Sequence, residues 1–242
     1  MKKNLLLIIT ALFTFTACDN IINGIANGVK GEGPIEKFTR DAKGFKGIDI
    51  QASADVQLTQ TNGDFKVVVE THKNIADIFE TVVEGDILIL KLKPGNNYVR
   101  YDKLVVYVDA PTFEKLIVSG SGNFTGGTLK SETMFTEVSG SGNISIKDLT
   151  TKELKSALGG SGNITIGGTT EKAVYEVSGS GDIDAKNTKA KDVKADLSGS
   201  GGVSCNAEVA FEGDVSGSGN IYYTGNPSVK SKVSGSGNIE KN

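Results

Sequence analysis

The chain has 242 residues, with 26 lysines and arginines against 29 aspartates and glutamates, so its formal net charge is −3. This balance, without a basic cluster, argues against a nucleic-acid partner. Glycine reaches 31 residues, proline only 4, and tryptophan is absent. Because the glycines follow no collagen period and valine, isoleucine and threonine are common, the composition favours turn-rich β structure.

The first 17 residues are predicted to be a signal peptide. Lys2 and Lys3 precede an apolar run over residues 5–15. That run is about half the length that a membrane-spanning helix requires, roughly 20 residues. The segment Phe15-Thr16-Ala17-Cys18 resembles a lipobox, in which the cysteine is acylated after cleavage, although Phe15 departs from the usual aliphatic residue. A plain secretory signal is the alternative.

We therefore expect an exported protein that is anchored in a bacterial envelope membrane by acyl chains on Cys18. The outer membrane is the expected location, and the sequence leaves open which face the protein occupies. Residues 18–36 are predicted to be a tether, because Gly24, Gly28, Gly31 and Gly33 occur there among few large apolar residues.

Residues 37–110 are predicted to form a β region. Apolar and polar residues alternate around Ile48, Val56, Val67, Ile87 and Val105. Asn62-Gly63 and Glu84-Gly85-Asp86 are turn signals, and residues 74–80 form the one plausible short helix, with Asn74 as its cap. This region could be the irregular first coils of a larger stack or a separate capping domain.

Residues 111–242 contain seven related pentapeptides of the Ser-Gly-Ser-Gly-Asn type, which recur every 18–20 residues. A period of this length suits one coil of a β-solenoid, so the fold class is predicted to be all-β. The pentapeptides begin at Ser119, Ser139, Gly159, Ser178, Ser198, Ser216 and Ser234. The last one is followed only by residues 239–242, and we expect a partner chain to cover that coil.

Alternation within each repeat separates an inner face from an outer face. Val138, Gly140, Gly142 and Ile144 share one parity, and the serines between them share the other. The motif glycines therefore point inward, where we expect no room for a Cβ, and they also permit the backbone angles that a corner may need. Cys205 has the inward parity too and is predicted to be a buried core thiol.

The outward residues are predicted to align into two surface ladders along the stack. Such ladders hold coils together and could also bind a ligand. The serine ladder comprises Ser121, Ser141, Ser161, Ser180, Ser200, Ser218 and Ser236. The asparagine ladder comprises Asn123, Asn143, Asn163, Asn220 and Asn238, with Asp182 and Gly202 at the two remaining positions.

Residues 38–239 resemble the auto-transporter adhesin head domain family, the GIN domain. The resemblance rests on Phe45-Lys46-Gly47-Ile48, Asp55-Val56, Gly85-Asp86-Ile87-Leu88-Ile89 and the serial Gly-Ser-Gly-Asn motifs. It implies a single-stranded, right-handed, β-helix-like solenoid in a lipoprotein of a Gram-negative envelope, with an adhesin role assigned by analogy. The family brings no motif-defined catalytic residues.

No metal or cofactor is predicted, and catalysis is not expected. His72 is the only histidine, and the nucleophile-elbow pattern is missing. Asp182 and Asp184 faintly resemble a calcium-binding repeat, but the period is wrong and dense carboxylate clusters are lacking.

The lipobox and the ladders together predict a non-enzymatic envelope lipoprotein that presents a Ser/Asn-lined surface to a glycan or a protein ligand. The main alternative is a periplasm-facing structural protein that self-associates through its edges and has no extracellular ligand. A polysaccharide-active β-helix enzyme is the weaker alternative, because its candidate carboxylates are scattered. Those candidates are Asp182, Asp184, Asp192, Asp196 and Asp214.

Overall fold

The structure is a computed structural model that describes residues 28–96 and 98–242. The predicted signal peptide, Cys18 and the beginning of the predicted tether lie outside the described residues. Within the described ranges, the strands form one 18-stranded sheet and one two-stranded sheet, accompanied by one short helix. No helix in these ranges is long and apolar enough to cross a membrane.

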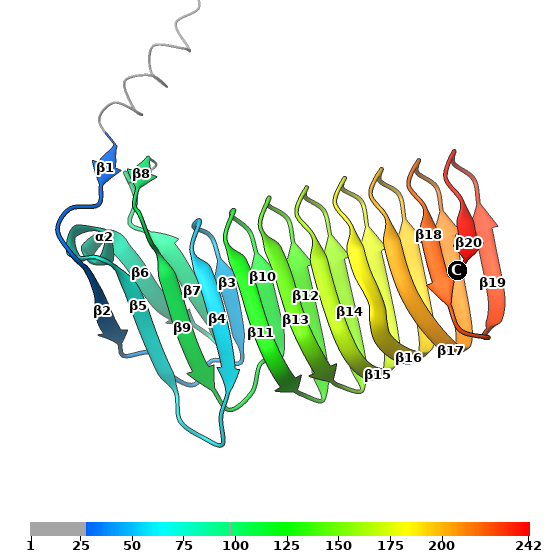
Figure 1. The fold of residues 1–242 in the computed structure, drawn as a ribbon, viewed down its shortest axis with the longest axis horizontal. Coiled ribbons are helices and arrows are strands. Elements are labelled where there is room, and N and C mark those ends of the chain that lie inside the picture. The colour runs from blue at the N-terminus through cyan, green and yellow to red at the C-terminus, as the bar shows by residue number, and fades with distance from the viewer. Residues whose placement is uncertain (1–27, 97) are drawn as a thin grey trace, which may run out of the picture.

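The repeat region forms a β-solenoid with coils of about 20 residues, which confirms the predicted fold class. Figure 1 shows the coils side by side along the long axis, with the pentapeptide corners forming one row of hooked turns along the upper edge. The strands of this region are β10 (Lys115–Val118), β11 (Asn123–Lys130), β12 (Thr133–Val138), β13 (Asn143–Thr150), β14 (Glu153–Leu158), β15 (Ile164–Val177), β16 (Ile183–Leu197), β17 (Val203–Val215), β18 (Ile221–Thr224), β19 (Ser228–Val233) and β20 (Ile239–Lys241).

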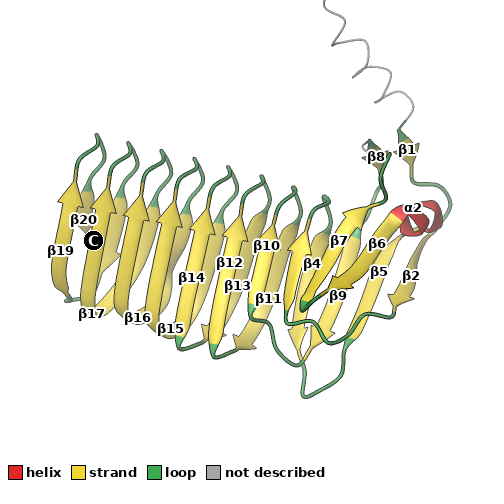
Figure 2. Ribbon diagram, turned by 180° about the vertical axis from the view of Figure 1, so that it is seen from behind, coloured by secondary structure: helices red, strands yellow, loops and turns green. Residues whose placement is uncertain are grey.

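Two walls of parallel strands enclose the core. We call wall A the strands that follow each pentapeptide corner and wall B the strands that lead into the next corner; both are visible in Figure 2. On wall A, Asn123 pairs with Asn143, and on wall B, Val118 pairs with Val138. The strands β15, β16 and β17 bend from wall A into wall B without interruption.

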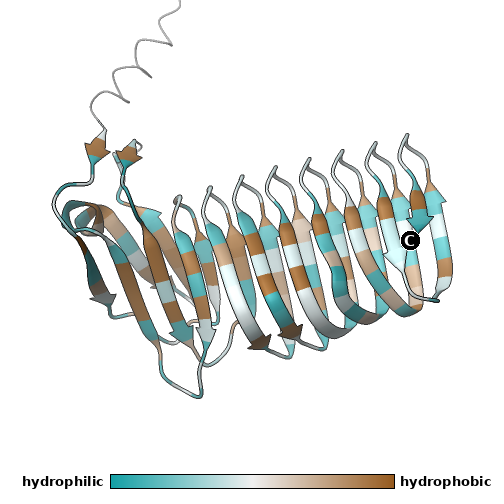
Figure 3. Ribbon diagram, in the orientation of Figure 1, coloured by the Kyte–Doolittle hydropathy of each residue, from teal (hydrophilic) through white to brown (hydrophobic). Residues whose placement is uncertain are grey.

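The inward residues of the two walls stack into continuous apolar files. Figure 3 shows the hydrophobic bands at corresponding levels of successive strands. Every member of the two files next to the corner is at most 2% exposed. Burying such a side chain stabilises the fold by about 1.5–3 kcal/mol. The files are Val118, Val138, Leu158, Val177, Leu197 and Val215 on wall B, and Phe124, Ile144, Ile164, Ile183, Val203 and Ile221 on wall A.

The motif glycines bring the backbones of neighbouring coils into direct contact. An ideal Cβ on Gly142 would lie 1.7 Å from the carbonyl oxygen of Gly122, and one on Gly140 would lie 1.8 Å from that of Gly120. The expectation that a Cβ has no room is therefore correct, and the obstacle is the preceding coil. None of these glycines has a positive φ. They are needed for close approach and not for special backbone angles.

The first coil lacks glycine at its corner. Strands β3 (Gly47–Ile50) and β4 (Asp55–Gln60) are joined by Gln51-Ala52-Ser53-Ala54, and the first pentapeptide stacks directly on this turn. β3 pairs in parallel with β10, and β4 with β11. On their other side, β3 pairs with β7 (Ile87–Leu92) and β4 with β9 (Val105–Ala110). This coil therefore lies between two segments that come later in the sequence.

Antiparallel strands close the N-terminal end of both walls. On wall A, β9 pairs with β5 (Lys66–His72), which pairs with β2 (Ile35–Arg40). On wall B, β7 pairs with β6 (Phe79–Glu84). At the other end of the described chain, β19 is exposed along its whole length, and its Val229 and Val233 are 45% and 47% exposed.

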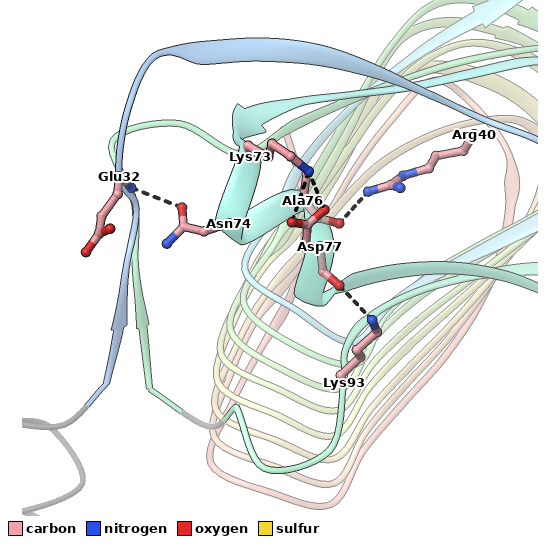
Figure 4. Close-up of polar contacts among 7 residues, drawn as sticks. All are labelled: Glu32, Arg40, Lys73, Asn74, Ala76, Asp77 and Lys93. Carbon is pink, nitrogen blue, oxygen red and sulfur yellow. Dashed lines mark hydrogen bonds and ion pairs between the residues drawn. The ribbon is translucent and has the colours of Figure 1, made fainter.

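The helix α2 (Lys73–Ile78) covers the N-terminal end, as Figure 4 shows. Its N-cap is His72, so the prediction that Asn74 caps it is wrong. Asn74 instead accepts a hydrogen bond from the Glu32 backbone N–H at 3.0 Å and donates one to the Lys30 carbonyl at 2.6 Å. Arg40 donates to the Ala76 carbonyl at 2.5 Å. The Asn74 side chain and the Ala76 carbonyl of the helix therefore hold the incoming chain and β2 against the cap.

Residues 28–36, which belong to the predicted tether, are partly ordered into structure. Strand β1 (Val29–Lys30) pairs in parallel with β8 (Val99–Arg100) and forms the two-stranded sheet. His72, which is 5% exposed, contacts the Gly33 carbonyl through Nδ1 at 2.9 Å and Asp102 Oδ2 through Nε2 at 3.3 Å. The chain is thus fixed to the cap before β2 begins.

Candidate functional site

The predicted asparagine ladder exists, and it bonds one coil to the next. Asn123 Oδ1 accepts the backbone N–H of Asn143 at 3.0 Å and its side-chain amide at 2.9 Å. Asn143 Oδ1 accepts the backbone N–H of Asn163 at 2.9 Å. Each side chain therefore satisfies a corner donor that would otherwise need water. The amide oxygens are occupied by the fold itself.

The ladder extends beyond the asparagines that the repeat identifies. Asp55, in the glycine-free coil, accepts a hydrogen bond from the Asn123 side chain at 2.7 Å. Asp182 takes an asparagine position and accepts the Gly202 N–H at 2.7 Å. Gly202 has no side chain to continue the file, and the ladder resumes where Asn220 accepts the Asn238 N–H at 2.9 Å. A carboxylate can therefore replace the amide oxygen in this role.

The predicted serine ladder lies at the exposed crest of the corner. Its backbone N–H groups donate to the first glycine of the preceding coil, as when Ser141 donates to the Gly120 carbonyl at 3.0 Å. All seven of its side chains are exposed. None of them lines a hollow among the pockets of the described chain that are discussed below.

A groove runs along wall B, just below the corner. It has a volume of about 640 Å³ and crosses several consecutive coils. Its polar lining is the first serine of the pentapeptide together with a carboxylate two residues earlier, and its apolar lining is the aliphatic residue between them. The lining residues are Glu137, Ser139, Ala157, Leu158, Gly159, Glu176, Val177, Ser178, Asp196, Leu197, Ser198, Asp214 and Ser216.

Parallel register brings the carboxylates into one file. Glu176 pairs with Asp196, and Asp196 pairs with Asp214. Strands in register lie about 4.8 Å apart, so the three carboxylates repeat at that interval along the groove. Glu137 belongs to the same file and is separated from Glu176 by Ala157.

Lysines of the neighbouring file pair with these carboxylates. Lys155 lies 2.8 Å from Glu176, and Lys194 lies 2.9 Å from Asp196. The carboxylate side chains keep 43% and 38% of their surface exposed. Such exposed ion pairs contribute little to stability because solvent screens them. The carboxylates remain accessible to a ligand from the side of the serines.

The groove is lined by a different file of serines from the one that the repeat predicts as a binding ladder. The first serines of the pentapeptides, such as Ser139 and Ser178, line the groove, whereas the predicted ladder consists of the second serines. The sequence alone presents Asp196 and Asp214 only as scattered enzyme candidates. The available signal was the recurring tetrapeptide of acid, aliphatic residue, serine and glycine that begins at Glu137, Glu176, Asp196 and Asp214.

The remaining candidates are used within the fold. Cys205 is fully buried, and burial raises the pKa of its thiol to about 12. Asp184 pairs with Lys186 at 2.9 Å. Within the described ranges, no three histidine, cysteine, aspartate or glutamate side chains are grouped so that they could hold a metal ion.

Comparison with known proteins assigns the chain to a family. Residues 44–227 match the family model described as "Putative auto-transporter adhesin, head GIN domain", and the chain belongs to this family. A search of curated proteins gave no match.

Solved structures share the whole fold. A crystal structure named as a putative adhesin from Bacteroides fragilis has a TM-score of 0.84 at 26% identity, and the match covers 88% of this chain and 100% of that one. A protein named as a putative lipid binding protein from Parabacteroides distasonis has a TM-score of 0.75 at 27% identity, with 88% and 98% covered. A putative adhesin from Parabacteroides merdae, with a TM-score of 0.71 at 22% identity and 88% and 98% covered, supports the fold alone.

Proposed function

We propose that the protein is a non-enzymatic binding module of adhesin type, and that the groove of wall B is its contact surface for a glycan or protein ligand. The groove itself carries this proposal, because it offers serine hydroxyls and carboxylates at coil spacing over several coils. Regularly spaced donors and acceptors suit an extended, repeating partner that makes many weak hydrogen bonds. The adhesin names of the family and of the similar structures support the same role.

An enzymatic role fits the groove less well. Hydrolysis of a glycosidic bond needs one carboxylic acid in an environment that keeps its proton, beside a second carboxylate. Glu176, Asp196 and Asp214 are all exposed to solvent and are all paired with lysines. Because the three carboxylates have similar surroundings, none of them is set apart as the proton donor that hydrolysis requires.

A panel of glycans and matrix proteins tests the proposed contact surface with the purified protein. The groove variant is Glu176→Gln/Asp196→Asn/Asp214→Asn. Its matched control is Asp64→Asn/Asp148→Asn/Glu208→Gln, which makes the same change in charge at three exposed acids outside the groove. We expect at least one specific ligand, bound at least about tenfold more weakly by the groove variant and unchanged by the control. No ligand above background, or equal loss in both variants, would contradict the proposal.

We further propose that the protein is exported, anchored through Cys18 and held in the outer membrane with its coils outside the cell. The lipobox segment supports the anchor, and the adhesin names support exposure to the exterior. Protease shaving of intact cells, with an epitope after Asn242 and a periplasmic control protein, tests the exposure. Loss of the epitope with the control intact is the expected result. Protection of both would place the protein inside and favour the periplasmic structural alternative.

A further inference from the structure

A second hollow lies on wall A at the N-terminal cap, far along the stack from the middle of the groove. It has a volume of about 240 Å³ and is lined by Lys37, Lys66, Val68, Tyr107 and Asp109. These residues come from β2, β5 and β9, which lie side by side at the cap in Figures 1 and 2. The pockets that enclose drug-sized ligands measure roughly 300–1,000 Å³, so this hollow fits one ring or one terminal group.

The antiparallel register explains why these side chains meet. Tyr107 pairs with Val68, and Asp109 pairs with Lys66. Their chain neighbours Val67, Val69, Val106 and Val108 are fully buried in the core, so the alternating residues between them face outward. Val68, only 8% exposed, forms the floor.

Hydrogen bonds to a shared carboxylate hold the Tyr107 ring, which forms the aromatic wall of the pocket, in place. The Tyr107 hydroxyl donates to Glu70 Oε2 at 2.6 Å, and Lys103 Nζ lies 2.9 Å from the same oxygen. These two bonds lower the pKa of Glu70, and the bond to Glu70 raises the pKa of Tyr107. Lys37 Nζ lies 4.9 Å from the centre of the Tyr107 ring. The ring is therefore fixed before any ligand arrives, which reduces the ordering cost of binding.

The charges of the lining favour an acidic group. In the sheet register Lys37 lies opposite Glu70 and Lys66 lies opposite Asp109, but among the described residues neither ammonium is within 4 Å of a carboxylate, whereas Lys103 pairs with Glu70 at 2.9 Å. A ligand carboxylate could take charge-assisted hydrogen bonds from Lys66 and from Lys37, whose ammonium lies beside the Tyr107 ring. Asp109 adds an acceptor for hydroxyl donors, while Tyr107 and Val68 offer an apolar wall and floor.

We propose that this pocket binds a terminal acidic sugar, a monosaccharide unit that carries a carboxylate. A sugar ring meets all the elements of the lining at once: its carboxylate faces the lysines, its hydroxyls face Asp109 and its C–H face lies on Tyr107. A carboxylate on a flexible peptide side chain would use the lysines but would offer Asp109 no hydroxyl donors. The pocket is a contact point separate from the groove, and it does not depend on the groove being functional.

Ligand-observed and protein-observed NMR titrations test the proposal with methyl glucuronide and the methyl glycoside of N-acetylneuraminic acid. Methyl glucoside is the uncharged comparison, and acetate with a glutamate-containing peptide reports simple carboxylate binding. We expect binding of at least one acidic sugar at millimolar concentration or tighter, and binding at least about tenfold weaker for methyl glucoside, as expected for the loss of a charge-assisted hydrogen bond. Equal binding of the uncharged sugar or of the peptide, or no binding of either acidic sugar, would overturn the proposal.

Three variants locate the site. Lys66→Gln and Tyr107→Leu should each weaken acidic-sugar binding at least about fivefold, and Lys66→Gln keeps the test valid if the tyrosine variant fails to fold. Lys147→Gln, at another exposed lysine of wall A, should bind as the native protein does. The groove variant should also bind unchanged, which separates this pocket from the proposed groove. Native binding by Lys66→Gln would overturn the assignment.

Discussion

The repeat stack and the N-terminal cap are stabilised in different ways. In the stack, one set of contacts recurs from coil to coil: glycine on glycine at the corner, a side-chain oxygen on the next backbone N–H except at Gly202, and an apolar file on each wall. In the cap, each contact occurs once. Asn74 holds Lys30 and Glu32, Arg40 holds Ala76, and Tyr107, Glu70 and Lys103 form a single relay.

This difference shows that stacking restricts which residues can occupy a corner, whereas the outer faces tolerate many different residues. A corner glycine lies against the backbone of the preceding coil, so a single added methyl group clashes there. Outer residues contact mainly solvent, so the walls can carry a groove on one side and a pocket on the other. The cap covers strand edges that would otherwise invite pairing with another chain.

The largest expected effect is at a corner glycine. Gly142→Ala would place a Cβ 1.7 Å from the Gly122 carbonyl, and backbone atoms cannot move aside cheaply. We expect a loss of at least about 3 kcal/mol in the free energy of unfolding, or failure to fold. Gly127→Ala is the control, since nothing lies within 4 Å of its Cβ position and its φ is not positive. Chemical denaturation measures both, and equal stability of the two variants would refute the stacking argument.

The core of the stack should make the protein less stable in alkali. Burial raises the pKa of Cys205 to about 12 and also raises that of Tyr175. The unfolded thiol releases its proton near pH 8.5 while the folded thiol keeps it, so stability is lost as pH rises. Between pH 8 and 10.5 we expect a decrease of about 2–3 kcal/mol in the free energy of unfolding. Cys205→Ala should show a shallower decrease, and an identical slope would contradict this origin.

An asparagine-to-alanine substitution in each region compares a repeated hydrogen bond of the ladder with the unique hydrogen bonds of the cap. Asn143→Ala removes the acceptor of the Asn163 N–H and should cost about 1–2 kcal/mol of stability. Asn143→Asp should cost less, because Asp182 already shows that a carboxylate oxygen can accept this bond. Asn74→Ala removes two solvent-exposed bonds of the cap and should cost below about 1 kcal/mol. Thermal unfolding of the three variants ranks their losses of stability. If Asn74→Ala is less stable than Asn143→Ala, the comparison is contradicted.

The smallest effect is a gain. Tyr175 is fully buried, and its hydroxyl has no hydrogen-bond partner within the described part of the chain. Ala195 occupies the same position in the next coil and Gly213 in the one after it, so neither side chain offers the hydroxyl a polar partner. Tyr175→Phe removes the unpaired hydroxyl and should stabilise the protein by up to about 1 kcal/mol. A loss of more than that in calorimetry would mean that the hydroxyl has a partner.

The sequence predicts the stack well because each coil repeats the same physical requirements. Period, parity and inward Cys205 follow from alternation around the pentapeptide, and the structure agrees. The glycine-free first corner at Gln51-Ala52-Ser53-Ala54 could not be recognised, because it has none of the glycines that define the pentapeptide. The helix cap was also misplaced: Asn74 bonds to a strand more than 40 residues away, which local pattern cannot reveal.

The groove was harder to predict than the fold. Its file of carboxylates is interrupted once by Ala157, and Lys232 takes the position in the final coil. The file is therefore not uniform in the sequence. Whether the first or the second serine faces a hollow depends on how the corner curves over wall B. Only the register of whole strands brings Glu176, Asp196 and Asp214 together.

Amide exchange mapped by NMR, with and without the tightest ligand from the binding panel, tests the central claim that wall B presents the binding surface. The account predicts that new protection is confined to residues 137–139, 176–178, 196–198 and 214–216, with the asparagine ladder unchanged. Protection confined to β11 and β13 of wall A, with those four segments unaffected, would contradict it.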